Sequence, residues 1–591
     1  MRGAWFAFFL VSGACSLVYQ VVWLRLAMAA FGVTTPMISI VIATFMAGLA
    51  LGSWAAGRVA RRAEVSNATP LRLYGLAELA IALSGVLVPW GLEAGRRALS
   101  GSTGPSWGSA GHYASAGLCV AVVLLPFCTA MGATFPLAMW SIRRTLPAAS
   151  ARSFSFLYLA NVIGATAGTL LSAFVAIELL GLRGTIRAAA GLNAALAVSA
   201  LALSRRASGD AAPADTVGTT ASSAPTVTGG TALRALLFAT GLASMGMEVV
   251  WVRQFTPYLG TLVYAFAIIL AVYLAATFAG SAAYRWWLAR AGAAHLPPAW
   301  IAPLLAVVGL LPLLSTDPRW PGSLHIALGA VRVAFGVGPL CATLGFVTPW
   351  LLDRLSGGRP ERVGGAYALN IAGCILGPLL AAFVLLPWLG ERWSLVALAA
   401  VMAASASWAL QARDAAPARS RVAWSAAAGT VALALGTRDF ATAFAHREVR
   451  RDHAATVIAT GEGAARRLLV NGQGMTHLTP ITKMMAHLPL ASLQEPPRRA
   501  LVVCFGMGTS FRSLASWDIE ATAVELVPSV AELFGYFHAD GPALLRKPDL
   551  HVVVDDGRRF LERTRESFDV ITVDPPPPVE AAGSSLLYTR E

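Results

Sequence analysis

Carboxylate side chains follow several predicted strands near the C-terminal end of the chain. The apolar strand RALVV leads into a turn that contains Gly506 and Gly508, and Glu525 closes the next strand nineteen residues after Gly506. Two later strands end at Asp556 and Asp574. Because the carboxyl ends of parallel strands meet at one edge of an open α/β sheet, we expect these groups to lie together. Glycines let a backbone approach a ligand, and a carboxylate at this spacing binds ribose hydroxyls, so the pattern predicts a Rossmann-type nucleoside site.

Five motifs in this part of the chain resemble the spermidine synthase (polyamine aminopropyltransferase) family. They are VVCFGMGTSFR, AVELVPSV, VDDGRRFL, FDVITVDPPPPVEAAGSSLLYTRE and, further upstream, MMAHLPL. The whole chain resembles bacterial proteins in which a major-facilitator-like membrane region is fused to such a domain. The resemblance implies polyamine chemistry, in which an aminopropyl group passes from decarboxylated S-adenosylmethionine to a small amine. It implies no metal.

The resemblance also implies a role for each residue of the predicted nucleoside site. In the family the glycine turn faces the amino-acid end of the donor, which here gives that role to Gly506 and Gly508. The acid after the second strand binds the ribose, here Glu525. The Asp-Gly pair after the third strand contacts adenine, here Asp556 and Gly557.

Asp574 is the residue to which the resemblance gives the catalytic role, because it follows the fourth strand. An amine is nucleophilic only when it is neutral, so a carboxylate must accept its proton before it displaces methylthioadenosine from the sulfonium. Four prolines follow at 575–578. They fix the next loop in an extended shape that lacks backbone donors.

The sequence departs from the family pattern around the acceptor. Thr509 and Ser510 stand where the glycine turn usually continues with Asp and Gly, and a second acid after Asp574 is replaced by proline. The segment before AHLPL usually offers an Asp-Glu pair, whereas THLTPITK supplies neutral groups and Lys483. A dicationic acceptor such as putrescine needs carboxylates at both ends. The departures therefore favour a different amine, or a domain that binds nucleoside without turnover.

Two alternatives to aminopropyl transfer remain open at this point. The DPPP sequence is similar to the Asp-Pro-Pro-aromatic turn of enzymes that methylate amino groups, although Pro577 stands where the aromatic residue belongs. A methyltransferase would use intact S-adenosylmethionine. The other alternative is a transporter-like membrane protein whose C-terminal domain only senses a nucleoside, with Glu78 and Glu248 as the functional residues of the spans.

The rest of the chain has the composition of a membrane protein. Of its 591 residues, 56% are hydrophobic and 13% are charged, whereas a soluble protein carries roughly a quarter charged residues. The formal net charge is +14, but the arginines lie in short loops between apolar runs, so nucleic-acid binding is not indicated. The six cysteines form no CxxC pair, which excludes the usual zinc and disulfide patterns.

The apolar runs form two similar sets, which predicts a duplicated six-helix unit with parallel orientation. SGACSLVYQVVWLR matches TGLASMGMEVVWVR, and YLANVIGATAG matches YALNIAGCILG. The fold class expected is a multi-pass α-helical membrane protein of twelve or thirteen spans, followed by an α/β Rossmann-like domain. The predicted parts are repeat A at 1–206, a linker at 207–231, repeat B at 232–412, a possible thirteenth helix at 421–437, a small β region at 440–497 and the Rossmann-like domain at 498–591.

Arginines after every even-numbered span predict that the N-terminus and those loops are cytoplasmic, in a bacterial inner membrane. The run at 421–437 is marginal in length for a span, so the sequence leaves the side of the C-terminal domain open. Family members continue beyond LYTRE, and we therefore expect the sheet to stop near its fourth strand, as in a truncated domain.

Overall fold

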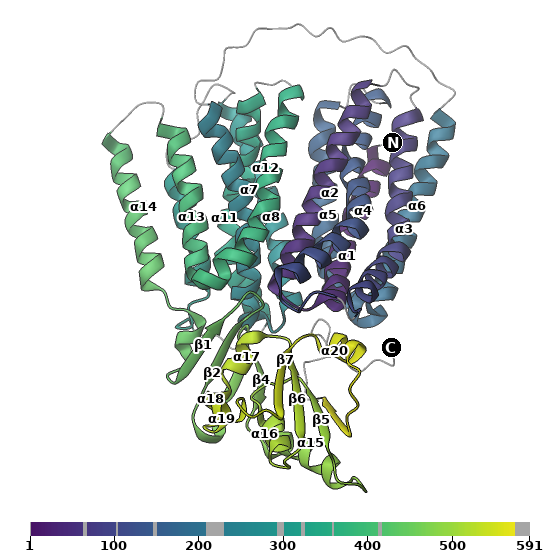
Figure 1. Cartoon of the computed structure of the whole chain (residues 1–591). Coiled ribbons are helices and arrows are strands. Elements are labelled where there is room, and N and C mark those ends of the chain that lie inside the picture. Colours follow the sequence, from purple (N-terminus) through teal and green to yellow (C-terminus); the bar gives the residue numbers. More distant parts are fainter. Residues whose placement is uncertain are drawn as a thin grey trace.

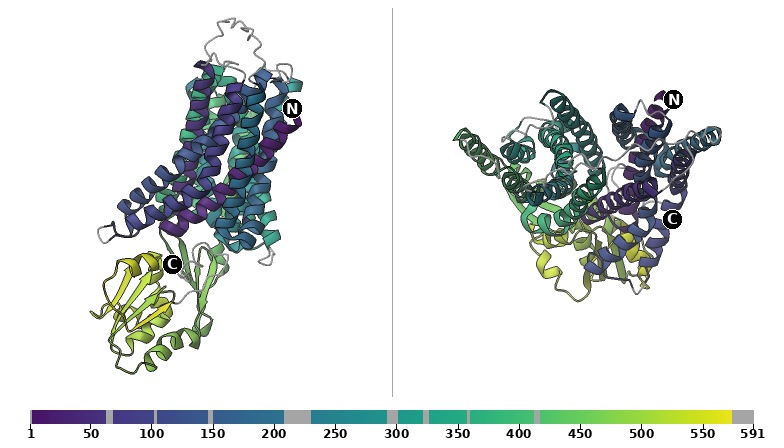
Figure 2. Two further views of the ribbon diagram at one scale, coloured as in Figure 1. Left: turned by 90° about the vertical axis from the view of Figure 1, so that its right-hand side faces the viewer. Right: turned by 90° about the horizontal axis from the view of Figure 1, so that it is seen from above.

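The computed structural model has a bundle of long helices that stands on a small α/β part (Figures 1 and 2). It describes residues 2–62, 68–101, 104–145, 150–207, 230–291, 301–320, 326–356, 360–411 and 417–573. Asp574 and most of the predicted linker, 208–229, lie outside the described residues.

Two sets of helices form the bundle, one on each side in Figure 1. Repeat A contains α1 (Arg2–Phe31), α2 (Thr35–Arg62), α3 (Ala68–Leu99), α4 (Ala110–Thr145), α5 (Ser150–Leu171) and α6 (Ile177–Ala207). Repeat B contains α7 (Gly230–Leu259), α8 (Leu262–Ala291), α9 (Ile301–Val308), α10 (Leu311–Ser315), α11 (Ile326–Ser356), α12 (Pro360–Leu380) and α13 (Leu386–Gln411). A further helix, α14 (Pro417–Gly436), follows.

Within the described residues, nine helical segments are long and apolar enough to cross a membrane. The two longest, with 47 and 44 residues, each contain two helices that meet at a glycine. The expected multi-pass fold class is confirmed. One expected span is shorter than predicted, because the run at 299–315 forms only α9 and α10, on either side of Gly309 and with Pro312 in the first turn of α10.

The same hinge occurs in both repeats. A π-helix of five residues, η2 (Ser172–Ala176) in repeat A and η3 (Ala381–Leu385) in repeat B, precedes it. Nine residues after each π-helix begins comes a glycine with nearly the same backbone angles: φ is 67° and ψ is 177° at Gly181, and φ is 70° and ψ is −177° at Gly390. This region of backbone space is open almost only to glycine. The hinge is therefore written into both copies of the sequence.

Matching contacts bring the helices of each repeat together. A Cβ on Gly13 would lie 2.5 Å from the carbonyl oxygen of Asn161, and one on Gly241 would lie 2.2 Å from that of Asn370. These pairs join α1 to α5 and α7 to α12, where only a small residue lets the backbones approach.

A second matched contact joins α2 to α4 and α8 to α11. Ser53 donates to the carbonyl of Gly132 at 2.9 Å, and Ser281 donates to that of Gly345 at 3.0 Å. The duplicated motifs thus mark duplicated packing.

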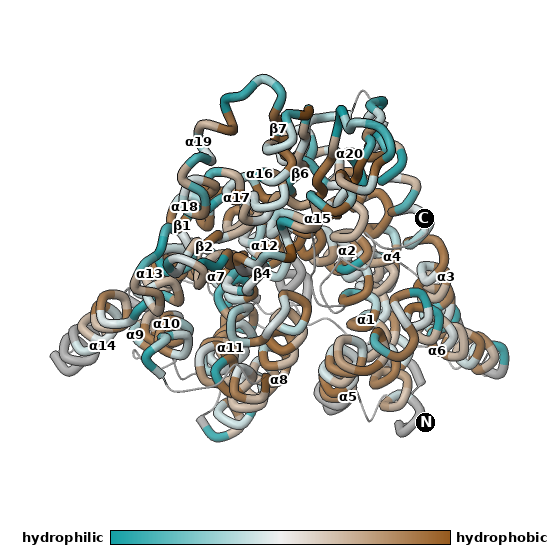
Figure 3. Tube along the Cα trace, turned by 90° about the horizontal axis from the view of Figure 1, so that it is seen from below, coloured by the Kyte–Doolittle hydropathy of each residue, from teal (hydrophilic) through white to brown (hydrophobic). Residues whose placement is uncertain are grey.

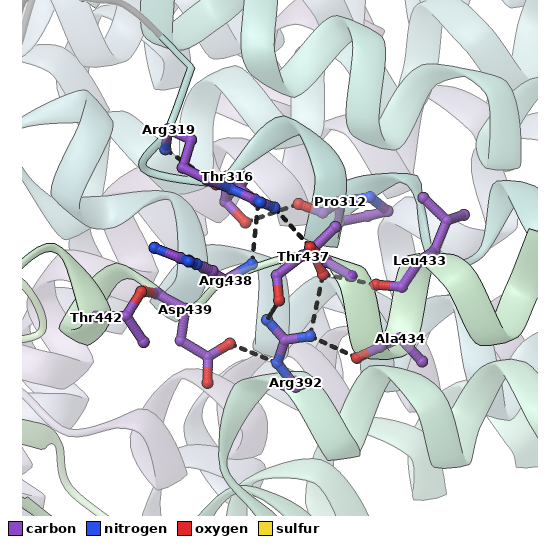
Figure 4. A network of polar contacts seen from close by, with 12 residues as sticks. Pro312, Thr316, Arg319, Arg392, Leu433, Ala434, Thr437, Arg438, Asp439 and Thr442 are labelled. Atoms are coloured by element: carbon purple, nitrogen blue, oxygen red, sulfur yellow. Dashed lines mark hydrogen bonds and ion pairs between the residues drawn. The ribbon is translucent and has the colours of Figure 1, made fainter.

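Arginine side chains fix the point at which α14 ends (Figure 4). Arg392 donates to the carbonyl oxygens of Ala434 at 2.6 Å and of Thr437 at 2.8 Å, and it pairs with Asp439 at 2.7 Å. Arg319 donates to the carbonyl of Gly436 at 2.6 Å. The last carbonyls of a helix lack partners within the helix and carry partial negative charge, so two guanidinium groups stabilise this end. The chain leaves α14 there and enters the small α/β part.

The first half of the α/β part is an antiparallel sheet of four strands in the order β1-β2-β3-β4. These strands are β1 (Arg447–Arg451), β2 (Thr456–Thr460), β3 (Arg467–Val470) and β4 (Gln473–His477), and α15 (Pro480–Ala491) follows them. Every residue of β2 is buried. Apolar side chains of this sheet and of the parallel sheet that follows form one hydrophobic core, so the two halves behave as a single body.

The second half is a parallel sheet of four strands in the order β7-β6-β5-β8. The strands are β5 (Arg499–Val503), β6 (Glu520–Glu525), β7 (Leu550–Val554) and β8 (Val570–Val573). The connecting helices are α16 (Thr509–Ala515), α17 (Pro528–Glu532), α18 (Phe534–Phe537), α19 (Gly541–Leu544) and α20 (Gly557–Arg563). Renumbered from β5, this order is 3-2-1-4, which is the start of a doubly wound fold with its switch point between β5 and β8.

The small α/β part lies at the end of the bundle opposite to the N-terminus (Figure 1). α14 runs from the N-terminal end of the bundle to the opposite end, where β1 begins, and it thereby carries the chain across. Viewed from below, the α/β part covers the ends of helices from both repeats (Figure 3).

Candidate functional site

The glycine turn after β5 has the shape expected of a ligand-binding loop. Gly506 has a φ of 55° and Gly508 a φ of 76°, and Cys504 just before them has a φ of 75°. A Cβ on Gly508 would lie 2.3 Å from the ring of Phe534, so no larger residue fits there. Gly508 is the N-cap of α16. The turn therefore presents backbone N–H groups at the carboxyl edge of the sheet.

Glu525, at the end of β6, closes onto this turn. One carboxylate oxygen accepts from the backbone N–H of Phe505 at 3.1 Å and of Gly506 at 3.3 Å, and the other accepts from Val527 at 3.0 Å. The side chain is buried, and burial raises its pKa despite these donors, which pull it down. The structure thus brings the predicted ribose-binding acid directly against the predicted glycine turn.

The third predicted element, the Asp-Gly pair after β7, begins α20. Asp556 is the N-cap, and its carboxylate accepts from the backbone N–H groups of Arg558 at 3.0 Å and Arg559 at 3.3 Å. A Cβ on Gly557 would lie 2.5 Å from Val503, which ends β5, so the glycine allows the helix to pack close to the sheet. These two residues lie at the same edge as Glu525, as predicted.

A further acid, Asp555, is buried beside this pair. It forms an ion pair with Arg559 at 2.9 Å. Burial raises the pKa of Asp555, and the neighbouring guanidinium opposes that shift. Asp555 therefore holds Arg559 in place at the start of α20, which leaves Asp556 to cap the helix.

Asp574 follows β8 directly and lies outside the described residues. β8 pairs with β5, so the backbone that leads to Asp574 ends beside the one that leads into the glycine turn. Thr572 in β8 also donates to the carbonyl of Met485 in α15, at 3.1 Å, which joins this edge to the helix that contains AHLPL. The catalytic role of Asp574 remains a prediction.

The residues that depart from the family pattern have structural partners of their own. Thr509 contacts the imidazole of His538 at 3.2 Å, and Ser510 donates to the carbonyl of Thr482 at 2.9 Å. Burial lowers the pKa of His538 to about 4, so the ring is neutral near pH 7. Lys483 is exposed. At these positions the structure replaces the usual acids with a neutral network.

The edge that carries the predicted site faces the membrane bundle. Arg558 and Arg559, at the start of α20, donate to the carbonyls of Ala29 and Pro105 in repeat A. Figure 1 shows α17 and α20 at the end of the α/β part nearest the helices. Any ligand at the carboxyl ends of the strands is therefore enclosed between the two parts of the molecule.

Trp107 is a residue of this site that sequence reasoning missed. It lies in the loop between α3 and α4, and its indole N–H donates to the carbonyl of Leu526 at 3.3 Å, one residue after Glu525. Trp107 and Asp556 line the same pocket, whose volume of about 20 Å³ has room for roughly one water molecule. The indole thus closes the adenine end of the predicted site.

No group of three or more His, Cys, Asp or Glu residues that could hold a metal ion occurs in the part of the chain that the structure describes. The polar groups at the edge of the sheet are instead backbone N–H groups, carboxylates and one indole. Such a set can hold a nucleoside by its ribose and base.

Comparisons with known proteins agree with this geometry. A family model described as spermine/spermidine synthase domain matches residues 479–591. The polyamine aminopropyltransferase of Saccharolobus solfataricus is 29% identical over 114 residues, which cover 18% of this chain and 37% of that protein. The one of Corynebacterium efficiens is 29% identical over 275 residues, covering 42% of this chain and 53% of that protein.

Among solved structures, that of the nucleoside transporter NupG is 13% identical, with a TM-score of 0.42, and covers 72% of this chain and 98% of that one. The chain spans about a third to a half of the length of the curated relatives it matches. The C-terminal part of the chain is thus similar to spermidine synthases, as its motifs predicted, and it follows a multi-pass helical region.

Proposed function

We propose that this protein is a membrane-bound aminopropyltransferase of the spermidine synthase type. It transfers the aminopropyl group of decarboxylated S-adenosylmethionine to an amine acceptor at the edge of the β7-β6-β5-β8 sheet. The donor's amino-acid end lies against Gly506 and Gly508, its ribose against Glu525, and its adenine near Asp556 and Gly557.

The observation that carries the proposal is the closed contact between Glu525 and the glycine turn. Both oxygens of this buried carboxylate accept from backbone N–H groups of the loops that surround the predicted ribose site. A buried acid with no structural ion pair among its printed contacts is costly, and it persists where a ligand uses it. The segment that contains it matches a spermine/spermidine synthase domain.

In the proposed reaction the acceptor nitrogen attacks the aminopropyl carbon attached to the sulfonium. A C–N bond forms while the C–S bond breaks, and its electron pair stays on sulfur, which gives neutral methylthioadenosine. Asp574 takes the proton that the amine loses, before or during the attack. The backbone and carboxylate contacts of the donor only hold it in line for this displacement.

We also infer that the α/β part lies on the extracytoplasmic side. It stands at the end of the bundle opposite to the N-terminus, and the arginine-rich loops after α2 and α4 lie at the N-terminal end. Short loops rich in arginine remain in the cytoplasm. A C-terminal alkaline phosphatase fusion should therefore be active and a C-terminal GFP fusion dark, and the reverse pattern would overturn the inference.

Calorimetry on the full chain in detergent tests the proposed function. Decarboxylated S-adenosylmethionine, S-adenosylmethionine and methylthioadenosine are titrated into the wild type, Glu525→Ala and Asp574→Asn. We expect the decarboxylated donor and methylthioadenosine to bind. Glu525→Ala should weaken both by at least roughly a hundredfold, because it removes a buried, charge-assisted contact.

Asp574→Asn serves as the matched control, because it should leave donor binding unchanged while abolishing transfer to any amine. Binding of S-adenosylmethionine alone would replace the proposal with methyl transfer. Binding of none of the three nucleosides to a folded wild-type protein would refute it.

A further inference from the structure

A pocket of about 540 Å³ lies between the two repeats, at the end of the bundle that meets the α/β part. Its volume is within the range of small-molecule sites. Its walls come from α2 and α4 of repeat A, from α12, η3 and α13 of repeat B, and from the loop between β1 and β2. The lining residues are Ile40, Gly108, Ala110, Tyr113, Ala114, Leu379, Phe383, Pro387, Trp388 and His453.

The outer rim of this pocket consists of large apolar side chains that no protein covers. Trp388 is 84% exposed and Phe383 is 36% exposed. Both belong to the segment Ala366–Ala409, which is long and apolar enough to lie in a membrane. In a bilayer such side chains contact lipid, and tryptophan prefers the level of the headgroups. The rim therefore opens the pocket toward lipid.

The inner end of the pocket is polar and is next to the predicted nucleoside site. His453 packs edge-on against Tyr113, with ring centroids 5.4 Å apart. Its neighbour Asp452 accepts from the backbone N–H of Ser529 at 3.0 Å, which follows Glu525 by four residues. On the opposite wall, Gly108 follows Trp107 directly. The pocket and the carboxyl edge of the sheet thus share two walls.

The chemistry of the lining does not suit a free polyamine. The lining contains no carboxylate, although a polycation would need several. Burial lowers the pKa of His453, so its ring is neutral near pH 7. A neutral imidazole and a phenol can bind one small polar group, and the remaining surface suits a hydrocarbon chain.

From the position, openness and lining of this pocket, we propose that it binds an apolar chain of a bilayer lipid whose headgroup is a primary amine. The lipid amine, and not a free polyamine, is then the acceptor at the nucleoside edge. This inference rests on the proposed function, because it names the acceptor for that transfer. Its C–N bond forms on the lipid nitrogen, the C–S bond of the donor breaks as above, and the amine proton passes to the same base.

The experiment uses the full chain in nanodiscs of two compositions, phosphatidylcholine alone and phosphatidylcholine with phosphatidylethanolamine. Decarboxylated S-adenosylmethionine that is isotopically labelled in its aminopropyl group is added, and the lipid fraction is analysed for label. In parallel, phosphatidylethanolamine with a diazirine on one acyl chain is photolysed, and the crosslinked peptides are mapped.

Ala114→Trp places an indole in the pocket, and Val198→Trp places one on α6, where the wild-type side chain is 66% exposed away from it. We expect label in the lipid fraction only with phosphatidylethanolamine, and crosslinks on the segments that line the pocket. Ala114→Trp should reduce both by about tenfold, since it fills the volume that the chain needs. Val198→Trp should reduce neither.

Calorimetry with the donor separates the two proposals. Donor binding that Ala114→Trp leaves intact, together with loss of lipid labelling, supports the inference. Donor binding with no label in lipid, or with equal transfer to soluble amines in both nanodiscs, overturns the inference and leaves the proposed function standing. Absence of donor binding overturns the proposed function, and the inference with it.

Discussion

The two membrane repeats share a hinge but treat the α/β part differently. Gly181 and Gly390 have nearly identical backbone angles and follow matching π-helices. Repeat B holds the α/β part through buried charge. Repeat A reaches over the predicted nucleoside site with an indole and exposed charge. The duplication thus preserved the architecture of the helices, while the residues at their ends diverged.

Repeat B forms the anchor around Glu391, next to its hinge. Glu391 pairs with Arg253 of α7 at 3.3 Å and with Arg451 of β1 at 3.7 Å, and it accepts from Thr456 of β2 at 2.6 Å. The side chain of Arg253 is only 2% exposed. Because charges buried in this way need their partners, this cluster fixes the β region rigidly to repeat B.

Repeat A forms the cover. Its helices α3 and α4 carry the loop with Trp107, and Arg96 near the end of α3 pairs with Glu562 of α20. The side chain of Glu562 is 37% exposed, so water screens this pair. A fixed contact on one side and a weak contact on the other let the cover open while the anchor stays closed.

The largest effect is expected from breaking the anchor. Glu391→Gln keeps the shape of the side chain but leaves the buried Arg253 without its counter-charge, which costs about 3 kcal/mol. Hydrogen exchange should report this as roughly hundredfold faster exchange of the amides of β2, whose residues Thr456–Thr460 are all buried. Unchanged protection in β2 would show that apolar packing alone holds the β region.

The hinge offers the next largest effect and compares the repeats directly. Alanine in place of Gly181 or Gly390 must adopt a backbone conformation that costs about 1–3 kcal/mol. A Cβ on Gly390 would also lie 3.0 Å from the guanidinium of Arg451, whereas nothing lies within 4 Å of one on Gly181.

We therefore expect both variants to increase amide exchange in the helices around their own hinge. Only Gly390→Ala should also loosen β1, since Arg451 is one of its residues. Loosening of β1 by Gly181→Ala would mean that the two hinges are coupled through the bundle, which would contradict the division between anchor and cover.

A smaller effect is expected from the cover itself. The pocket beside Asp556 has room for about one water, so adenine enters only when Trp107 moves aside. Trp107→Ala removes the indole hydrogen bond and the ring, so the open form no longer has to be created at the expense of binding energy. The apparent Kd for methylthioadenosine should fall by roughly fivefold in calorimetry.

Trp107→Phe, which lacks only the indole N–H, is the matched control and should give an intermediate Kd. Weaker binding by Trp107→Ala would instead assign the indole to a stacking wall that is part of the bound state.

The local features of this molecule could be predicted from the sequence. Gly506, Glu525 and Asp556 lie at one edge of one parallel sheet because each follows a strand, and strand endings are marked by nearby residues. The repeats could be predicted because Gly13 and Gly241 occupy matching positions in similar motifs, and each permits the same close helix contact.

The relation between distant parts could not be predicted in this way. Trp107 lies in a glycine- and serine-rich loop that has no periodicity, and its partner Leu526 is 419 residues away. Likewise, Arg25 and Arg253 occupy the same motif, but only Arg253 meets a carboxylate that also binds the β region. Such contacts depend on how two finished surfaces meet, which no short stretch of residues specifies.

The smallest effect is expected from the exposed ion pair between the cover and α20. Glu562→Gln should cost about 0.5 kcal/mol, because solvent-exposed pairs contribute little and salt screens them. Hydrogen exchange in α20 should therefore increase about twofold at low ionic strength and not measurably at 0.5 M salt. Arg96 keeps its second partner, Glu93, at 2.8 Å, so α3 itself should be unaffected. An effect on α20 as large as that of Glu391→Gln on β2 would mean that repeat A anchors the α/β part as firmly as repeat B does, and that the cover cannot open independently.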